Sequence, residues 1–415
     1  MRVSNGTIEI MAPVGCLESL AAAIQARAGS VYFGIQGLNM RSGSANNFTV
    51  ETLPEVVRTC REHGVKSYLT VNTIMYDSDL GKMRQIIDAA ADAGVSAIIA
   101  CDVAAMVYAR QRGVEVHLST QLNVSNVEAL RFYAQFADVV VLARELDIEQ
   151  VRRIHEAIVN EDIRGPYGGR VRIEMFAHGA LCMAVSGKCY LSLHEYGKSA
   201  NRGECAQVCR HGYSVHDNEH DIDLDIDNEY IMSPKDLKTI HFLDRMLEAG
   251  VEVLKIEGRA RGPEYVKTVV SCYREAVGSI ADGTYGKEKV AAWDERLARV
   301  FNRGFWDGYY LGQRLGEWSG HYGSQATEHK EYAARTLGYY GRIGIGDFRC
   351  DAAELHRGDR VLIIGPTTGV VEMTLGEMQV DYQAVETIRK GERFTTPVPE
   401  KIRPADKLYL IVKNG

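Results

Sequence analysis

The chain has 415 residues, a hydrophobic content of 46% and a formal net charge of −7 at neutral pH. This length favours one large domain plus a small one, with a substantial core. The negative total excludes a global attraction to nucleic acid, so RNA would have to bind through a local basic patch. No long apolar run and no signal peptide are visible, which predicts a cytoplasmic protein without a transmembrane helix.

Short β-type runs alternate with helical patterns over the first two thirds of the chain. The expected strands are Ile8–Ala12, Val31–Gly34, Ser67–Asn72, Ala97–Cys101, Val116–Ser119, Val139–Ala143, Val171–Ala177 and Glu252–Glu257. Apolar residues at helical spacing predict helices over Leu17–Ala28, Leu80–Ala93, Val103–Gln111, Val127–Phe136, Ile148–Val159 and Ser233–Ala249. Eight βα units predict an α/β fold, a (β/α)8 TIM-like barrel over residues 1–325. An open doubly wound sheet is the alternative, although no G-x-G-x-x-G follows the first strand.

Polar side chains gather where the expected strands end, which is the working face of such a barrel. They are Arg41, Asn46, Asn47, Asn72, Asp102, Gln121, Arg144, Glu145, His178, Glu257 and Arg259. Some strand-end residues cap helices instead, and Asp102 and Asp147 are candidates for that role. We expect substrate to bind at Arg41, Asn72, Gln121, Arg144 and Glu145. We take Glu174, His178, Glu257 and Arg259 as candidate catalytic residues, although a lone histidine such as His178 is as often merely hydrogen-bonded.

Four of the nine cysteines fall in a long insertion, residues 181–230, between the seventh and eighth expected strands. Their spacing is C-x6-C-x15-C-x3-C, formed by Cys182, Cys189, Cys205 and Cys209. Four thiolates suit zinc or an iron–sulfur cluster, and the spacing matches neither the common zinc ribbon nor the standard ferredoxins. Nearby cations, Lys188, Arg202 and Arg210, would lower thiolate pKa values and offset the charge of a cluster. We expect the other five cysteines to be packing residues.

The second half of the insertion and the end of the chain both read as β structure. Acidic and apolar residues alternate over 216–229, which predicts an exposed hairpin rather than a calcium loop, because the central glycine is missing. A polar linker over 320–330 precedes residues 335–415, whose short β runs and glycine turns predict a small β-barrel domain. Such a module binds RNA or another chain, or serves as a lid or oligomer contact.

Common hydrolase and nucleotide-binding signatures are absent from the sequence. It contains no H-E-x-x-H zinc site, no G-x-S-x-G nucleophile elbow and no phosphate-binding P-loop.

The run Glu174-MFAHGALCMAVSGKCYLS resembles the signature of the collagenase-like peptidase family, peptidase family U thirty-two. Further stretches fit the same family, namely Ile10-MAPVG, Val31-YFG, Asn39-MRSGSANNF, His117-LSTQ, Ala143-RELD, Ile231-MSPKDL, Leu254-KIEGR and Phe301-NRGF. Within the family, the C-terminal module, with Val371-EMTLGEM, looks like the branch responsible for tRNA hydroxylation.

The resemblance implies a tRNA hydroxylase that forms 5-hydroxyuridine at the wobble position and depends on prephenate. It also implies that Cys182, Cys189, Cys205 and Cys209 hold a [4Fe–4S] cluster, although the cysteine pattern of the related ubiquinone branch is not identical. Arg41, Arg144 or Arg259 would then pair with the carboxylates of prephenate. Two alternatives remain open at this stage: a peptidase, as the family name says, and a non-catalytic assembly factor with a structural cluster. The sequence leaves the oligomeric state open.

Overall fold

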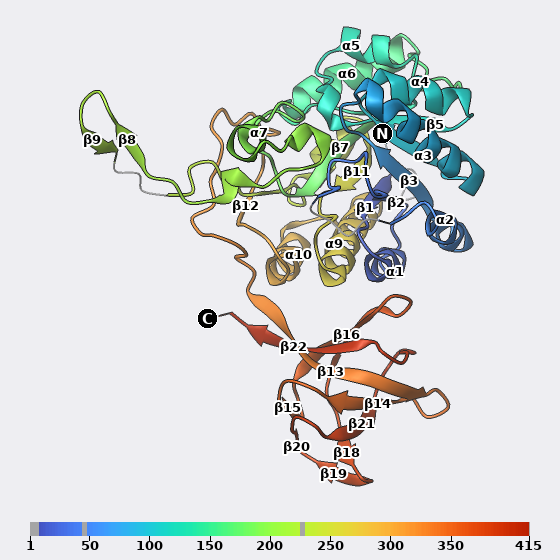
Figure 1. Ribbon diagram of the computed structural model, residues 1–415, viewed down its shortest axis with the longest axis vertical. Coiled ribbons are helices and arrows are strands. Elements are labelled where there is room, and N and C mark those ends of the chain that lie inside the picture. Colours follow the sequence, from blue (N-terminus) through green and yellow to red (C-terminus); the bar gives the residue numbers. More distant parts are fainter. Residues whose placement is uncertain (1–7, 44–47, 225–228, 415) are drawn as a thin grey trace.

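The computed structural model describes residues 8–43, 48–224 and 229–414, in which eight parallel strands form a closed barrel. These strands are β1 (Glu9–Pro13), β2 (Ser30–Phe33), β3 (Lys66–Val71), β4 (Ala97–Ala100), β5 (Glu115–Leu118), β6 (Val139–Val141), β7 (Arg172–Gly179) and β11 (Val251–Ile256). Strand β11 pairs with both β1 and β7 and so closes the ring (Figure 1). The predicted (β/α)8 barrel is therefore confirmed.

Helices surround the barrel, as the apolar spacing predicts. They are α1 (Leu17–Gln25), α2 (Leu53–Glu62), α3 (Leu80–Ala93), α4 (Val103–Gln111), α5 (Val127–Tyr133), α6 (Ile148–Asn160), α8 (Leu243–Glu248), α9 (Pro263–Ala281) and α10 (Lys287–Arg299). The side chains of Asp102 and Asp147 accept backbone N–H groups at the starts of α4 and α6, which confirms that both are N-caps. Helices α2, α9 and α10 were not among the ranges expected from the apolar spacing.

The expected helix over Ser233–Ala249 is wrong in its first half. Residues Asp236–Lys238 form β10, which pairs antiparallel with the end of β7, and only Leu243–Glu248 is helical as α8. The reason is tertiary, because the carboxyl end of β7 offers backbone groups that β10 satisfies. Asp236 is also 1% exposed, and a helix with its polar face toward solvent would not bury it.

The barrel interior is partly polar. Apolar and aromatic side chains fill it, namely Met11, Tyr32, Tyr68, Ala97, Ile99, Val139 and Val253. Glu9 accepts a hydrogen bond from the Tyr68 hydroxyl at 2.7 Å and pairs with Arg172 at 3.3 Å. Burial opposes ionisation of Glu9, but Arg172, Tyr68 and Lys66 outweigh it and hold the Glu9 pKa at about 2. The interior therefore tolerates charges because each is paired.

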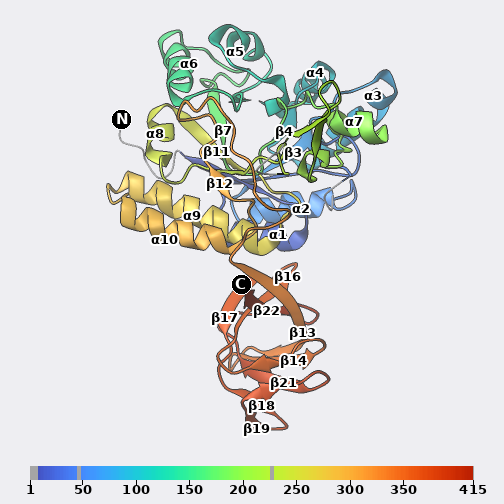
Figure 2. The same ribbon diagram turned by 90° about the vertical axis from the view of Figure 1, so that its left-hand side faces the viewer.

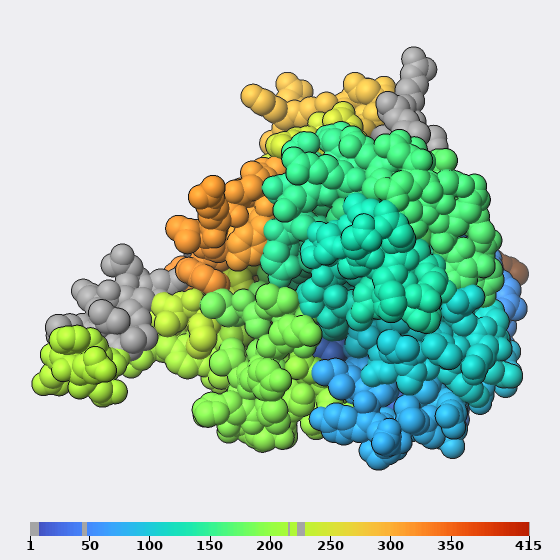
Figure 3. Space-filling view, turned by 90° about the horizontal axis from the view of Figure 1, so that it is seen from above, coloured from blue at the N-terminus to red at the C-terminus, as the bar shows by residue number. Residues whose placement is uncertain are grey.

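The insertion between β7 and β11 carries helix α7 (Leu191–Tyr196) and a hairpin. Strands β8 (Val215–Asp217) and β9 (Ile222–Leu224) pair antiparallel, which confirms the predicted hairpin. Seen from above, residues 216–221 of this hairpin stand out from the body of the molecule (Figure 3). Residues 225–228 of the alternating stretch, and Asn46 and Asn47, lie outside the described residues.

The C-terminal module is an antiparallel sheet with a core of its own, built around Phe348, Phe394 and neighbouring apolar residues. Its main strands are β13 (Glu328–Tyr340), β14 (Ile345–Cys350), β16 (Arg360–Gly365), β17 (Gly369–Thr374), β18 (Met378–Val380), β19 (Gln383–Val385), β21 (Arg393–Pro397) and β22 (Lys407–Lys413). They follow the order β17-β16-β22-β13-β14-β21-β18-β19. The all-β prediction is confirmed. The expected boundaries at residues 325 and 335 stay predictions, and β13 begins between them.

The module packs against the barrel through α1 and α9, below the barrel in Figure 2. The Gln25 side chain donates to the Thr368 carbonyl at 2.8 Å and accepts from the Val370 amide at 2.9 Å. Lys267 donates to the Val370 carbonyl at 2.6 Å. The turn between β16 and β17 is therefore fixed at the end of α1. Within the described parts of the chain, no helix is long and apolar enough to span a bilayer.

Gly179 ends β7 and leads directly into the cysteine segment. Its φ is +105°, and a Cβ there would lie 2.4 Å from the Glu257 carbonyl oxygen. We expect Gly179→Ala to lower the free energy of unfolding by about 3 kcal/mol or more, because backbone strain and a backbone clash add. Gly64→Ala is the matched control, since Gly64 has φ +68° but open space around it, and should cost only about 1 kcal/mol. If urea unfolding shows that the two variants lose equal free energy of unfolding, the backbone clash at Gly179 is contradicted.

Candidate active site in a cysteine-lined cavity

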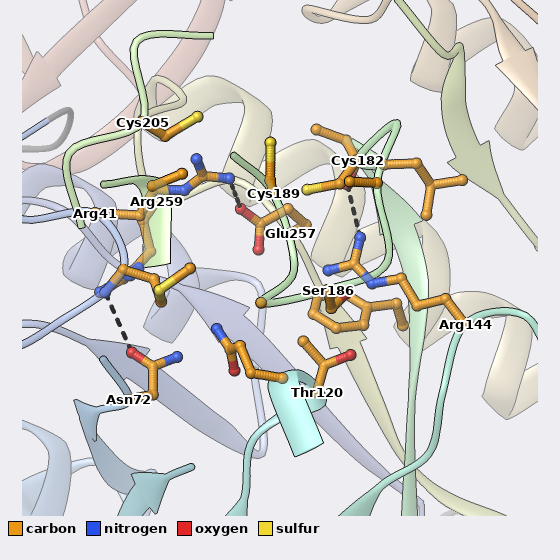
Figure 4. A pocket seen from close by; sticks show the side chains of 18 of the residues that line it. Arg41, Asn72, Thr120, Arg144, Cys182, Ser186, Cys189, Cys205, Glu257 and Arg259 are labelled. Carbon is orange, nitrogen blue, oxygen red and sulfur yellow. Dashed lines mark hydrogen bonds and ion pairs between the residues drawn. The ribbon is translucent and has the colours of Figure 1, made fainter. Parts of the chain in front are cut away.

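The carboxyl ends of the barrel strands and the start of the insertion enclose a cavity of about 210 Å³ (Figure 4). Its floor comes from the strand ends, with Tyr32, Thr70, Ile99, Phe176 and Lys255. Its roof comes from residues 180–210 of the insertion. The cavity therefore lies at the face where barrel enzymes place their chemistry.

All four cysteines of the insertion line this cavity. Figure 4 shows Cys182, Cys189 and Cys205 around the same space. Burial raises the pKa of the Cys209 thiol, Arg210 lowers it, and the other three cysteines raise it further, which places the four thiols near one another. Among the described residues, no three Cys, His, Asp or Glu side chains converge closely enough to hold one metal ion. The thiols thus surround a space instead of meeting at a point.

Hydrogen bonds within the insertion and to neighbouring segments fix the cysteine segment. Arg210 donates to the carbonyls of Leu181 at 2.5 Å and Pro234 at 2.7 Å, and so ties the two ends of the insertion together. The Asn123 amide donates to the Ser186 carbonyl at 2.8 Å. The backbone of the cysteine segment is therefore held by Arg210 within the insertion and by Asn123 from outside it.

The cavity wall is strongly cationic. Seven positively charged side chains line it, namely Arg41, Arg144, Arg210, Lys255, Arg259, Arg261 and Arg303. Glu257 is the only carboxylate among the described lining residues. A chain with net charge −7 has thus gathered a positive patch at this one place. Such a surface attracts anions, whether a metal–thiolate cluster, a carboxylate or a phosphate.

Glu257, directly after β11, organises one wall. Arg41 Nη2 lies 2.8 Å from its Oε1, and the Tyr32 hydroxyl donates to its Oε2 at 3.1 Å. Burial alone would raise the pKa of Glu257, but Arg41, Arg144 and Arg259 outweigh burial and hold the pKa at about 2. Glu257 is therefore ionised at neutral pH and anchors Arg41 instead of serving as a general acid.

Arg259 and Asn72 are held by neighbours from other strands. Arg259 Nη1 donates to Asn39 Oδ1 at 3.1 Å and to Thr70 Oγ1 at 2.9 Å. Burial lowers the pKa of Arg259 to about 10, so the guanidinium keeps its charge at neutral pH. Asn72 accepts from the Met40 amide at 3.2 Å and donates to Ser119 Oγ at 3.1 Å.

Arg144 has a hydrogen-bond donor that no protein group in the described part of the chain accepts. Its guanidinium lies 3.8 Å from the centre of the Phe176 ring, and one Nη donates to the Ala180 carbonyl at 3.3 Å. Its Nε is buried without a partner. Gln121, the remaining predicted residue in the cavity, accepts a short hydrogen bond from Ser119. An unpaired buried donor beside a cationic cavity marks a place for an acceptor on a ligand.

Three of the predicted site residues do not line the cavity. His178 is 1% exposed and packs among Tyr265, Tyr273 and Phe305. Burial, with Lys238 and Arg261, lowers the pKa of His178 to about 3, so it is neutral at physiological pH. Glu174 lies inside the barrel, where it accepts from Lys255 Nζ at 2.6 Å. Glu145 is exposed and borders a smaller neighbouring hollow.

Sequence reasoning missed several residues of the site. Lys255 connects the cavity floor to Glu174, and a lysine between two buried apolar residues of a strand, Leu254 and Ile256, was the signal that could have found it. Asp236 lies 3.7 Å from Arg261 and 3.6 Å from Arg303, and so holds two cations of the opposite wall. Burial raises the pKa of Asp236, and the arginines oppose that effect. Asp236 was missed because the sequence pattern placed it in a helix over Ser233–Ala249.

Comparison with known proteins places the chain in a family. The model of "Peptidase family U32" matches residues 15–320, about three quarters of the chain. The chain therefore belongs to peptidase family U32, as its motifs predict.

Relatives within the family carry different names. A protein named "Collagenase" from Porphyromonas gingivalis is 64% identical over 98% of both chains. "tRNA hydroxylation protein P1" from Bacillus subtilis is 36% identical over 73% of this chain and 70% of its own. "23S rRNA 5-hydroxycytidine C2501 synthase" from Escherichia coli is 32% identical over 76% of this chain and 47% of its own. The family thus contains both proteins named as collagenases and proteins named for RNA hydroxylation.

The buried pair Lys255–Glu174 predicts a large effect of single substitutions. We expect Lys255→Met to lower the free energy of unfolding by about 3–5 kcal/mol, because it leaves the Glu174 charge buried without its partner. Adding Glu174→Leu should recover most of that loss, since the uncompensated charge is then gone. Urea unfolding of the two variants measures this. A double variant less stable than Lys255→Met would contradict the pair.

The depressed pKa of Glu257 predicts an acid-dependent contribution to stability. Because the folded pKa, about 2, lies below the usual 4.5, the contribution should be complete above about pH 5 and lost as pH falls toward 2. Glu257→Gln should remove it. The stability difference between wild type and variant, measured by urea unfolding from pH 7 to pH 3, should therefore shrink on acidification. Glu9, whose pKa is also lowered, is present in both proteins, so its contribution cancels in the difference. A stability difference that does not change with pH would refute the lowered pKa of Glu257.

Proposed function

We propose that this protein is an iron–sulfur enzyme that hydroxylates a pyrimidine base in RNA, with a tRNA wobble uridine as substrate. The observation that carries the proposal is the joint lining of one cavity by four thiols and seven cations at the carboxyl end of a barrel. A hydrolase that activates water without a thiolate-bound metal needs neither feature. A redox enzyme acting on an anionic polymer uses both.

The donor set fits an iron–sulfur cluster. Cys182, Cys189, Cys205 and Cys209 would hold it, because soft thiolates on all sides of a small space suit a polynuclear centre. A thiolate-bound cluster is anionic. Arg41 interacts electrostatically with Cys182 and Cys205, and its positive charge would offset that of the cluster. Bound there, the cluster would supply one-electron redox chemistry. Wall residues then bind and orient the organic reactants.

The arginines of the cavity differ in whether protein partners already bind them, and this suggests how anionic reactants are held. Arg41 is committed to Glu257 and Arg259 to Asn39 and Thr70, so these side chains form a rigid charged wall. Arg144, with its unpartnered Nε, is the first candidate to pair with a carboxylate of prephenate, the co-substrate that the family resemblance implies. Lys255 and Tyr32 close the floor and keep bulk water from that side.

RNA as the substrate is supported by two relatives, whose names describe tRNA and rRNA modification. Phosphates of RNA would meet a local cationic cavity even though the whole chain is acidic. A cytoplasmic location belongs to the same proposal, because that is where tRNA is modified.

A peptidase is the second candidate, favoured by the 64% identical relative named "Collagenase". In that case the cavity would bind a peptide, and the cysteines would hold a structural or hydrolytic metal.

The test compares cavity and non-cavity cysteine variants in a deletion strain. We expect mass spectrometry of tRNA nucleosides to show 5-hydroxyuridine derivatives with wild type and with Cys16→Ser, whose cysteine lies outside the cavity. The derivatives should be absent from the deletion strain and reduced at least about ten-fold with Cys205→Ser, because one cluster ligand is lost. The same anaerobically purified proteins should differ in their iron–sulfur absorption in the same order.

Gelatin cleavage, measured with the same preparations, tests the peptidase alternative. Unchanged nucleosides in the deletion strain, together with gelatin cleavage that Cys205→Ser abolishes, would replace the hydroxylase with the peptidase.

A further inference from the structure

The rim of the cysteine-lined cavity carries exposed apolar and aromatic side chains. Met183 and Val185 line the cavity yet are 43% and 45% exposed. Tyr76 and Tyr190 are 57% and 69% exposed. Large apolar groups gathered at one mouth mark a binding surface, while single exposed residues elsewhere need no explanation. Tyrosine adds a flat ring that stacks at little entropic cost.

Tyr190 lies between two lining residues of the cavity in the chain. Its two chain neighbours, Cys189 and Leu191, both line the cavity. It is the N-cap residue of α7, so its backbone is fixed by the start of that helix. Tyr190 is therefore an exposed aromatic residue next in the chain to a proposed cluster ligand.

Tyr76 forms a second, braced platform. The Arg202 guanidinium lies 4.0 Å from the centre of the Tyr76 ring. Asp79 holds Arg202 with contacts of 2.7 and 3.2 Å, and the Ile74 carbonyl accepts from it at 3.0 Å. The residue before Arg202, Asn201, lines the cavity. The stacked pair is therefore tied to the cavity wall by a network that does not need the tyrosine.

We propose that Tyr76, braced by Arg202, and Tyr190 form a stacking platform for the single-stranded loop of an RNA hairpin. The inference rests on the proposed function and specifies how its substrate is held. A base inside a stack cannot enter a closed cavity, so enzymes that modify bases take the target out of the stack. Its neighbours then need other aromatic surfaces, which the two tyrosines supply.

Charge favours RNA over a peptide as the occupant of this rim. Seven cations line the cavity behind the rim, against one carboxylate among the described lining residues. Phosphates on either side of an extruded base carry one negative charge each and match that excess. A peptide backbone is neutral and offers no counterpart to so many cations.

The experiment measures binding of fluorescently labelled RNA to the full-length protein. The probes are a hairpin with a single-stranded loop and a blunt duplex of equal phosphate number. We expect Tyr76→Leu and Tyr190→Leu each to weaken hairpin binding about ten-fold, because one stacking surface is lost. Duplex binding should not change, since it depends on phosphates alone. Tyr167→Leu is the control, because Tyr167 is 59% exposed but hydrogen-bonds Gly113 at the opposite end of the barrel.

The outcomes separate this inference from the function on which it rests. Hairpin binding that both variants weaken supports the platform even if no hydroxylated nucleoside is found, in which case the proposed reaction fails alone. Hydroxylation by wild type, with hairpin affinity unchanged in both variants, overturns the platform alone. Equal binding of hairpin and duplex by wild type, or displacement of the hairpin by gelatin, also overturns it.

Discussion

The pairing of β7 with β11 is the constraint on which the rest of the site depends. It closes the barrel, and the backbone bond from the Glu257 amide to the His178 carbonyl, at 2.8 Å, continues it past the end of the strand. Because the two strands are parallel, the chain between them leaves at the carboxyl end of β7 and returns at the amino end of β11. The cysteine insertion directly follows β7 and therefore lies at the barrel mouth, where Glu257 and Arg259, which follow β11, also lie.

Electrostatic cost explains the layout of the cavity. Cations this close together are stable only where carboxylates hold some of them and a ligand meets the others. Glu257 anchors Arg41, Glu174 anchors Lys255, and Asp236 lies between Arg261 and Arg303. Each carboxylate comes from the barrel side or from β10, so the scaffold fixes the cations before any ligand arrives. Preorganised charge of this kind is what an anionic cluster and an anionic substrate both require.

Names within the family divide between peptide and RNA chemistry, and the site helps to weigh them. The relative named "Collagenase" is 64% identical over nearly the whole chain, whereas the two RNA-hydroxylation relatives from Bacillus subtilis and Escherichia coli described above are 36% and 32% identical over about three quarters of it. Identity across the fold does not assign a reaction, because reactions reside in sites. We base the proposal of a redox enzyme acting on RNA on the cysteine set and the cationic wall.

The sequence by itself determined the barrel, its eight strands and the four cysteines. The period of the apolar residues records local structure, and four cysteines in one short segment predict a shared site. Only the tertiary structure decided which strand-end residues share the cavity. It brought Arg41, Asn72, Gln121, Arg144, Glu257 and Arg259 together, and it placed His178 in an aromatic cage and Glu174 inside the barrel. Side chains alternate between the two faces of a strand, so the sequence pattern predicts which of them point inward. Whether a residue just after the strand lines the cavity depends on the path of the loop, which no local pattern encodes. Asp236 and Lys255 show the same limit, because their partners come from segments distant in sequence.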